Sequence, residues 1–130
     1  MLGYVTFGAN DMAVSGPFYA AVLGTIGYKK AHDGEWHGYC PDGDMSKGNM
    51  VWLGAPYNGQ AAVPSNGTMI GFMAPTRQMV RDFHATALKM GGTSEGEPGI
   101  REAYGPNMYM AYVRDPIGNK MSVMCMADSE

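Results

Sequence analysis

The strongest constraint on this chain is an internal repeat with a period of half its length. When the 130-residue sequence is displaced by 65 residues, segment 4–9 aligns with segment 69–74, and the two share one apolar pattern. Six identities fall in this register: Phe7 with Phe72, Ala9 with Ala74, Phe18 with Phe83, Ala20 with Ala85, Leu23 with Leu88, and Gly27 with Gly92. Self-similarity at one fixed offset is the signature of a duplicated structural unit. We therefore expect two modules of the same fold.

The first half is predicted to contain a strand, a helix and three more strands. Alternating apolar residues predict a strand over 3–9, and a helix is expected over 12–24. Pro17 removes a helix hydrogen bond unless it lies in the first turn. We therefore favour Ser15 over Asp11 as the N-cap, with a distorted lead-in before it. Short strands are expected over 26–31, 35–40 and 48–55.

The second half repeats this order. A strand is predicted over 68–74 and a helix over 77–90, which Thr76 caps and Gly91 ends. A stripe at helical spacing should face the sheet: Met79, Phe83, Ala87 and Met90. Further strands are expected over 92–96, 107–114 and 119–126, with a tight turn over 115–119.

Segment 57–67 is rich in Gly, Pro, Asn and Ser, and it is predicted to be the linker between the halves. The fold class that follows is α+β, with two βαβββ modules related by duplication that form a cup-shaped curved sheet. A chain of this length suits one domain over 1–130, with module 1 at about 1–56 and module 2 at about 68–126.

Strand alternation separates two faces of each sheet, because successive side chains point to opposite sides. The face expected beneath the helices carries Val5, Phe7, Ala9, Val51, Leu53, Ile70, Phe72, Ala74, Met121, Val123 and Cys125. The other face carries Tyr4, Thr6, Gly8, Met50, Trp52, Met69, Gly71, Met73, Lys120, Ser122, Met124 and Met126. If the two sheets curl toward each other, this second face lines a cup that is aromatic, rich in methionine and nearly uncharged.

Composition excludes several classes of function. Nine Lys and Arg against twelve Asp and Glu give a net charge of −3, which disfavours nucleic-acid binding. No apolar run approaches the ~20 residues that span a bilayer, and the N-terminus lacks the features of a signal peptide. Two cysteines, Cys40 and Cys125, make no disulfide framework. We expect a soluble cytoplasmic protein with free thiols and no nucleic-acid or membrane partner.

Three segments carry a resemblance to a known family. They are MLGYVTFGANDMAVSGPFYAAVLGTIGYKK, IGFMAPTRQMVRDFHATALKMGG and AYVRDPIGNKMSVMCM, which together cover more than half of the chain. In their order and spacing they resemble the vicinal oxygen chelate superfamily, which includes glyoxalase I, bleomycin-resistance proteins and extradiol dioxygenases. This resemblance implies paired βαβββ modules, a cup-shaped site and a homodimer.

The resemblance also implies a divalent metal at the base of the cup, held by His, Gln or Glu on the first and last strands of each module. The corresponding positions here are Tyr4, Trp52, Met69 and Ser122. None is a good donor for a hard or borderline cation. A slip of one residue brings in no strong ligand either: Gly3, Val5, Thr68, Ile70, Met121 and Val123. We therefore expect no metal and no other cofactor.

Other chemistry-bearing residues are assigned structural roles. The spacing of His32, His37 and Cys40 lacks a second ligand pair, so we interpret them as loop histidines beside a buried thiol. The remaining residues in this group are Asp42, Asp44, His84, Arg114 and Asp115.

The sequence favours a protein that binds a small apolar or aromatic molecule in a metal-free cup. The ligand-binding candidates are Tyr4, Trp52, Met69, Tyr109, Ser122 and Arg101, the last from a loop that overhangs the cup. Core packing for Tyr109 and an exposed charge for Arg101 stay open as alternatives.

Two other functions also stay open. One is an enzyme of the same superfamily, a lyase, isomerase or dioxygenase, which is metal-free or has atypical metal ligands. In it Tyr4 or Tyr109 acts as acid or base and Arg101 holds an anion. The other is a degenerate module kept for association. The sequence identifies no catalytic residue and no particular ligand.

Overall fold

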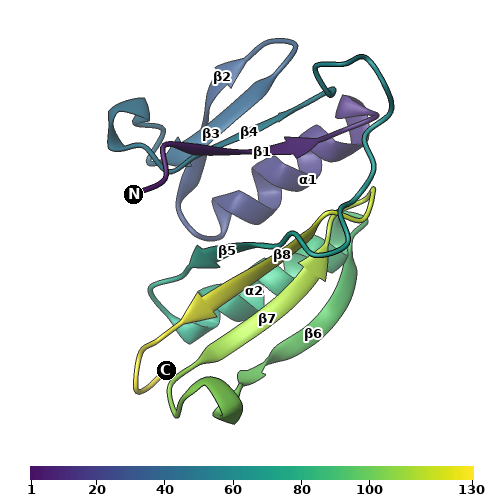
Figure 1. Cartoon of the computed structure of the whole chain (residues 1–130). Helices are drawn as coiled ribbons and strands as arrows, with labels where there is room; N and C mark the ends of the chain where they lie inside the picture. Colours follow the sequence, from purple (N-terminus) through teal and green to yellow (C-terminus); the bar gives the residue numbers. More distant parts are fainter.

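A computed structural model describes all residues, 1–130, as two modules of equal element order (Figure 1). Module 1 contains β1 (Tyr4–Gly8), α1 (Met12–Gly24), β2 (Tyr28–Asp33), β3 (His37–Pro41) and β4 (Met50–Gly54). Module 2 contains β5 (Ile70–Met73), α2 (Arg77–Lys89), β6 (Thr93–Ile100), β7 (Tyr109–Arg114) and β8 (Lys120–Cys125). The predicted βαβββ duplication is confirmed.

Both sheets have the same topology. Their strand orders are β1-β4-β3-β2 and β5-β8-β7-β6, and in each the first strand pairs in parallel with the last. A parallel pair needs a crossover connection, which the helix and the two middle strands supply in each module. No hydrogen bonds join β1 to β5, so the two sheets lie next to each other without closing into one.

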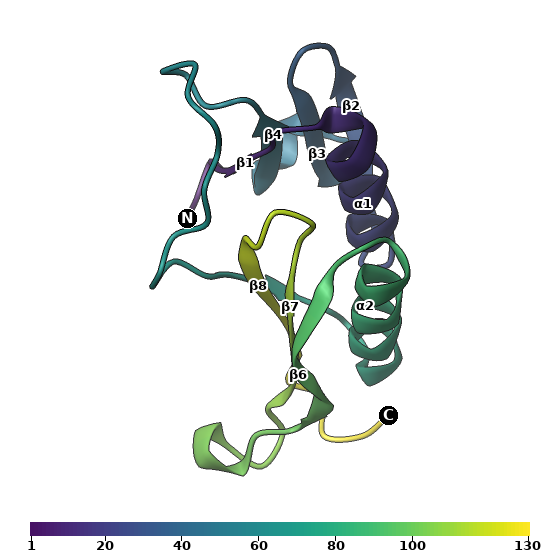
Figure 2. The same ribbon diagram turned by 90° about the vertical axis from the view of Figure 1, so that its right-hand side faces the viewer.

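Both helices cover the same side of the molecule. Figure 2 shows α1 and α2 stacked one above the other on the right of the two sheets, and the opposite faces of the sheets carry no α-helix. Neither helix is long and apolar enough to cross a membrane. We call the uncovered side of each sheet its open face.

The helix-covered face is the core that alternation predicts. Nine of its expected residues are buried: Phe7, Ala9, Val51, Leu53, Phe72, Ala74, Met121, Val123 and Cys125. Val5 and Ile70 pack on this core but stay partly exposed, since they lie on β1 and β5, the strand edges that face each other across the unclosed junction.

The start of α1 differs from the prediction. Asp11, not Ser15, is the N-cap, and its carboxylate accepts a hydrogen bond from the Ala13 backbone N–H. The helix then continues through Pro17, and Ser15 is buried inside it. Burial of the following turn against the sheet offsets the hydrogen bond that Pro17 cannot donate, so packing overrides the local preference.

The start of α2 follows the prediction, while its buried face is slightly rotated. The Thr76 hydroxyl accepts from the Met79 backbone N–H, and Gly91 ends the helix with a φ of 100°. The fully buried residues are Val80, Phe83, His84 and Ala87, whereas Met79 and Met90 lie at the margin.

Strand ends differ by a few residues from the predicted ranges, as in β2, which begins after Gly27 with its φ of 86°. The largest change is β6, which runs to Ile100 because its pairing with β7 continues through irregularities near Gly96 and Gly99. Irregularities of this kind arise in the backbone and leave no clear pattern in the side chains, so they are hard to predict from the sequence.

A buried carboxylate joins the two modules. Asp115 lies in the β7–β8 turn, and its Oδ1 accepts from the backbone N–H groups of Ile117, Gly118 and Asn119 at 2.9–3.0 Å. Its Oδ2 accepts from the Tyr19 hydroxyl of α1 at 2.6 Å and from the Asn119 amide at 2.8 Å. Asn119 also donates to the Gly8 carbonyl of β1 at 3.0 Å. One side chain therefore fixes a turn of module 2 against a helix of module 1.

Removal of this carboxylate is expected to destabilise the whole chain. Asp115→Ala leaves buried N–H and O–H donors without an acceptor, so we expect a loss of about 3 kcal/mol or more in the free energy of unfolding. Tyr19→Phe removes one donor and should cost about 2 kcal/mol. Urea denaturation measures both. Asp44→Ala is the control, because Asp44 also caps backbone, at Ser46, but on the surface. Equal losses of unfolding free energy in the Asp44 and Asp115 variants would contradict the stabilising role of the buried Asp115 carboxylate.

Replacement of Pro17 is expected to stabilise the protein. Pro17→Ala restores an N–H that can donate to the Ala13 carbonyl, and an interior proline costs about 3 kcal/mol relative to alanine. Part of that gain is lost through greater freedom of the unfolded chain, so we expect a net gain of about 1–3 kcal/mol in urea denaturation. Val14→Ala, an exposed change in the same helix, should have a much smaller effect. A destabilised Pro17→Ala protein would show that the proline fits the helix without strain.

Candidate functional site

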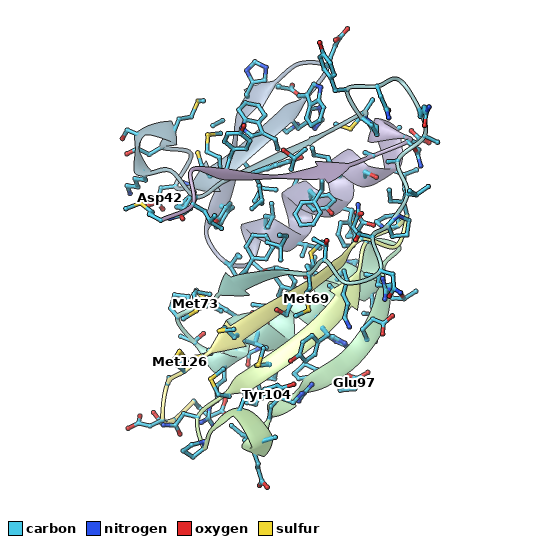
Figure 3. The ribbon with its side chains drawn as sticks, viewed as in Figure 1. Asp42, Met69, Met73, Glu97, Tyr104 and Met126 are labelled. Atoms are coloured by element: carbon cyan, nitrogen blue, oxygen red, sulfur yellow. The ribbon has the colours of Figure 1, made fainter.

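The candidate site lies on the open faces, where large side chains are left uncovered by helices. Figure 3 views this side of the molecule, with Met69, Met73 and Tyr104 among its labelled residues. These three side chains and that of Tyr4 are exposed, although all are largely apolar. Exposed apolar groups gathered on one side of a protein typically mark a binding surface.

A tryptophan lies flat on the open face of the first sheet. Trp52 of β4 pairs with Gly38 of β3, and a Cβ placed on Gly38 would lie only 2.7 Å from Cζ3 of the indole ring. The His32 ring of β2 makes a T-shaped contact with the indole, with centroids 5.6 Å apart. The glycine on β3 therefore lets the indole lie across the sheet, where Trp52 is partly exposed to solvent.

A second tryptophan has the same arrangement nearer the linker. The ring of Trp36 lies directly over Gly54, the last residue of β4. The linker folds back beside it, because the Asn10 amide donates to the Ala62 carbonyl and its oxygen accepts from the Ala62 N–H. A hollow of about 600 Å³ between this linker and β1 is lined in part by Trp36 and Thr6. The linker thus forms one wall of the open face of module 1.

The second sheet carries its ring on a different strand. Tyr112 of β7 lies over Gly96 of β6, with its Cδ2 2.9 Å from a Cβ placed on that glycine. Two cations flank the phenol ring. The Arg101 guanidinium lies 5.4 Å from the ring centroid, and the Lys120 ammonium lies 5.8 Å from it.

Strand register relates the two open faces residue by residue. Trp52 pairs with Thr6 on β1, just as Ser122 pairs with Gly71 on β5, and Thr6 and Gly71 are repeat equivalents. Trp52 and Ser122 are therefore equivalent positions, which supports the assignment of Trp52 that the family resemblance implies. In the same way Gly38 of module 1 corresponds to Tyr112 of module 2. The large ring has changed strands between the copies.

Five of the six ligand-binding candidates lie on or beside the open faces. Tyr4 is 66% exposed, Met69 is exposed, and Trp52 and Arg101 are partly exposed. Ser122 lies on the same face but is only 1% exposed, because its neighbours cover it. Its hydroxyl is therefore an unfavourable contact for a ligand.

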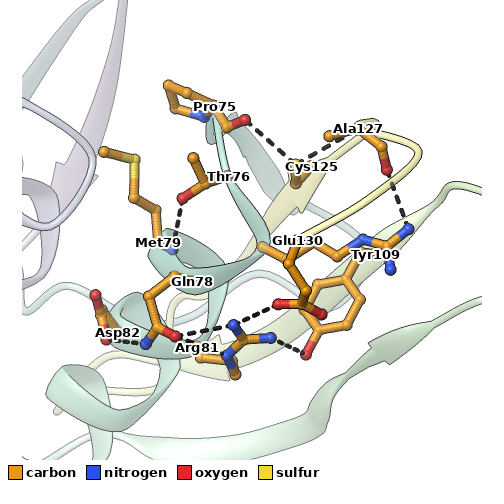
Figure 4. A network of polar contacts seen from close by, with 11 residues as sticks. Pro75, Thr76, Gln78, Met79, Arg81, Asp82, Tyr109, Cys125, Ala127 and Glu130 are labelled. Carbon is orange, nitrogen blue, oxygen red and sulfur yellow. Dashed lines mark hydrogen bonds and ion pairs between the residues drawn. The ribbon is translucent and has the colours of Figure 1, made fainter.

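Tyr109 does not reach the open face. It pairs with Cys125 on the core side of β7, and its hydroxyl accepts a hydrogen bond from Arg81 of α2 at 3.2 Å. The Arg77 guanidinium lies 5.3 Å from its ring centroid, and Glu130 pairs with Arg81 nearby (Figure 4). The sequence-based expectation of a cup contact is thus wrong for Tyr109, and core packing, the alternative, holds.

Alternation along β7 contains the signal that identifies the correct tyrosine. Ala111 is a core residue, so Tyr109, two residues away, shares its side, while Tyr112 must lie on the other. Tyr112 was not among the candidates predicted from the sequence. Lys120 was predicted to lie on this face but was not named as a ligand-binding candidate, although its ammonium lies beside the Tyr112 ring.

The four metal positions implied by the family resemblance do not fit a divalent cation. A phenol, an indole, a thioether and a covered hydroxyl stand at Tyr4, Trp52, Met69 and Ser122. Such cations take carboxylate, imidazole or thiolate donors. The structure contains no group of three His, Cys, Asp or Glu side chains that could hold an ion, and His37 instead lies 3.2 Å from Asp33. No chemical step through a metal is supported.

The phenol on the second sheet is not poised as a base. Burial raises the pKa of Tyr112 above its usual value and the nearby Tyr104 adds to this rise, while Arg101 opposes it. The phenol therefore stays protonated at neutral pH, and it offers a ring and a hydroxyl rather than a proton acceptor.

The other polar residues have structural partners. Asp115 and Asp44 cap turns, Asp42 pairs with Lys47, and Arg114 pairs with Glu95. The His84 ring is buried at the edge of the core, and its Nε2 lies 2.8 Å from the Ser94 hydroxyl.

Comparison with known proteins gives a clear structural answer. No protein-family model matches the chain, and no curated protein matches it. Among solved structures, a glyoxalase/bleomycin resistance protein from Albidiferax ferrireducens T118 is 34% identical. Its alignment covers 97% of this chain and 98% of that protein, with a TM-score of 0.84.

More distant structures share the fold. A glyoxalase/bleomycin resistance protein/dioxygenase family enzyme from Burkholderia phytofirmans PsJN is 15% identical, over 96% of this chain and 98% of that one, with a TM-score of 0.70. A glyoxalase-related enzyme from Fulvimarina pelagi is 17% identical, over 96% and 87%, with a TM-score of 0.74. Together with the identity to the Albidiferax protein, the duplicated fold shows that the chain belongs to the glyoxalase/bleomycin resistance protein/dioxygenase family, within the vicinal oxygen chelate superfamily.

Proposed function

We propose that the protein binds a small apolar or aromatic molecule on its open faces, without a divalent cation. The ligand would stack on the partly exposed ring of Trp52 and contact the thioether of Met69 and the phenol of Tyr4. Methionine adapts its shape to a ligand, and aromatic rings bury large areas at little entropic cost. The hydroxyl of Tyr112 and the guanidinium of Arg101 would orient the bound molecule.

The arrangement of Trp52 is the observation that carries this proposal. The indole is packed over Gly38 and against His32, and it remains partly exposed to a ligand. It stands where the family resemblance implies a metal ligand, so the position supplies a stacking surface in place of a donor atom. A flat, preordered ring loses little freedom on binding, which favours affinity.

The names of the relatives include both binding proteins and enzymes. The Albidiferax protein is called a glyoxalase/bleomycin resistance protein, and the Burkholderia protein is called an enzyme. For this chain, the lack of suitable metal donors at the four implied positions and the raised pKa of Tyr112 favour the binding role.

Two further expectations accompany the binding role. A homodimer is proposed from the family resemblance, and the exposed Met73 and Met126 would be natural contacts between two copies. A cytoplasmic location is likewise a proposal.

Replacement of Trp52 is expected to weaken ligand binding strongly. The probe is naphthalene-2-methanol, a neutral two-ring compound, and its affinity is measured by calorimetry. Loss of a stacking ring costs about 1–3 kcal/mol, so Trp52→Ala should weaken binding about tenfold or more. Leu88→Ala is the control, since it removes an exposed apolar side chain on α2, away from the open faces.

A second variant keeps the indole but changes its position. Gly38→Ala places a Cβ 2.7 Å from the indole and must lift the ring, so binding should weaken while Trp52 is still present. Both variants are checked for folding by their urea midpoints. Unchanged affinity in folded Trp52→Ala and Gly38→Ala proteins, or no binding by the parent protein, would refute the proposed function.

A further inference from the structure

The open face of module 2 contains a hollow with an unusual balance of charge. It has a volume of about 320 Å³ and is lined by Met69, Glu95, Arg101, Tyr104, Tyr112 and Lys120. Figure 3 labels Met69 and Tyr104 on this side of the molecule, with Met69 nearer to module 1. The hollow therefore combines two phenol rings, a thioether and two cationic side chains.

Neither cation in the hollow has a carboxylate partner. Arg101 donates to two backbone carbonyls, those of Glu97 at 2.6 Å and Gly99 at 3.0 Å, and it forms no salt bridge. Those two bonds orient the guanidinium over Tyr112 and leave other N–H groups free. Lys120 forms neither a side-chain hydrogen bond nor a salt bridge; its ammonium lies over the Tyr112 ring, and its charge contributes to lowering the pKa of the nearby Glu95.

The hollow has a single carboxylate, and its main partner lies outside the set of residues that line the hollow. Glu95 pairs with Arg114, which lowers the pKa of Glu95 below its usual range, and Lys120 adds to this effect. The two cations Arg101 and Lys120 outnumber the one carboxylate of the hollow, in a chain whose net charge is −3. Charge of one sign gathered against the overall balance favours a ligand of the opposite sign.

We propose that this hollow binds the carboxylate of an aromatic monoanion. This inference rests on the proposed binding of an aromatic molecule and adds the charge of the ligand. A guanidinium held by backbone oxygens offers paired N–H donors that match a carboxylate, and Lys120 adds a second charge from the other side of Tyr112. With its carboxylate in the hollow, the ligand ring would extend past Met69, on the side nearer to module 1, toward Trp52. Glu95 nearby disfavours a dianion such as a phosphate monoester.

The test compares two probes with the same ring system. Naphthalene-2-carboxylate and naphthalene-2-methanol differ in charge, and calorimetry measures both affinities at low ionic strength. We expect the carboxylate to bind about tenfold more tightly, because a charge-assisted hydrogen bond contributes about 1.5–3 kcal/mol. The preference should shrink at high salt, since the site is partly open to solvent.

Variants locate the preference. Lys120→Gln should reduce it severalfold, while binding of naphthalene-2-methanol changes little. Arg101→Gln should reduce the preference at least as much, and because Arg101 also bonds to the backbone of its own loop, this variant is checked by urea denaturation. The Lys120 ammonium donates no hydrogen bond within the protein, so the Lys120 variant is the decisive one. Lys89→Gln, a charge removed from the exposed end of α2, should keep the full preference.

The outcomes separate this inference from the proposed function. Equal affinities for the two probes, or a preference that survives both Lys120→Gln and Arg101→Gln, overturn the anion site and leave aromatic binding intact. Failure of both probes to bind overturns the proposed function and, with it, the anion site. A preference lost equally in Lys89→Gln would show only an effect of overall charge and would also overturn the site.

Discussion

The architecture depends on one buried carboxylate. Asp115 accepts hydrogen bonds from three backbone groups of its own turn and from the side chains of Asn119 and Tyr19. A buried carboxylate is tolerated only where its oxygens have such partners. Because Tyr19 belongs to module 1 and Asp115 to module 2, this contact also sets the relation between the modules. It helps to keep both helices on one side and both open faces on the other.

The open faces owe their character to glycines on neighbouring strands. Gly38 and Gly96 each leave room for a large ring from the adjacent strand, Trp52 in one module and Tyr112 in the other. The two modules thus share one sheet register, but the large ring lies on the last strand, β4, in module 1 and on β7, the strand before the last, in module 2. The two halves of the site have become different in chemistry: indole and imidazole on the first sheet, phenol and cations on the second. A ligand with an aromatic ring at one end and a negative charge at the other would match these two open faces.

Much of this arrangement could be predicted from the sequence, for clear physical reasons. A period of two in strands and a repeat of 65 residues placed the core face and the open face correctly, because both patterns are local and regular. The cap of α1 was missed because tertiary burial kept Pro17 inside the helix. The burial of Ser122 could not be predicted, since it depends on side chains of neighbouring strands. Tyr109 was misplaced although alternation pointed to Tyr112, so the information was present and was not used.

We propose that the open faces bind an aromatic molecule at the positions where the family resemblance implies a metal ion. Metal content after incubation with Mn²⁺, Fe²⁺, Ni²⁺ or Zn²⁺ and removal of free ions tests it most directly. We expect far less than stoichiometric metal in the parent protein, and no difference in the Tyr4→Phe and Ser122→Ala proteins. Stoichiometric binding that disappears in either variant would show that these side chains hold a cation, and it would contradict the claim.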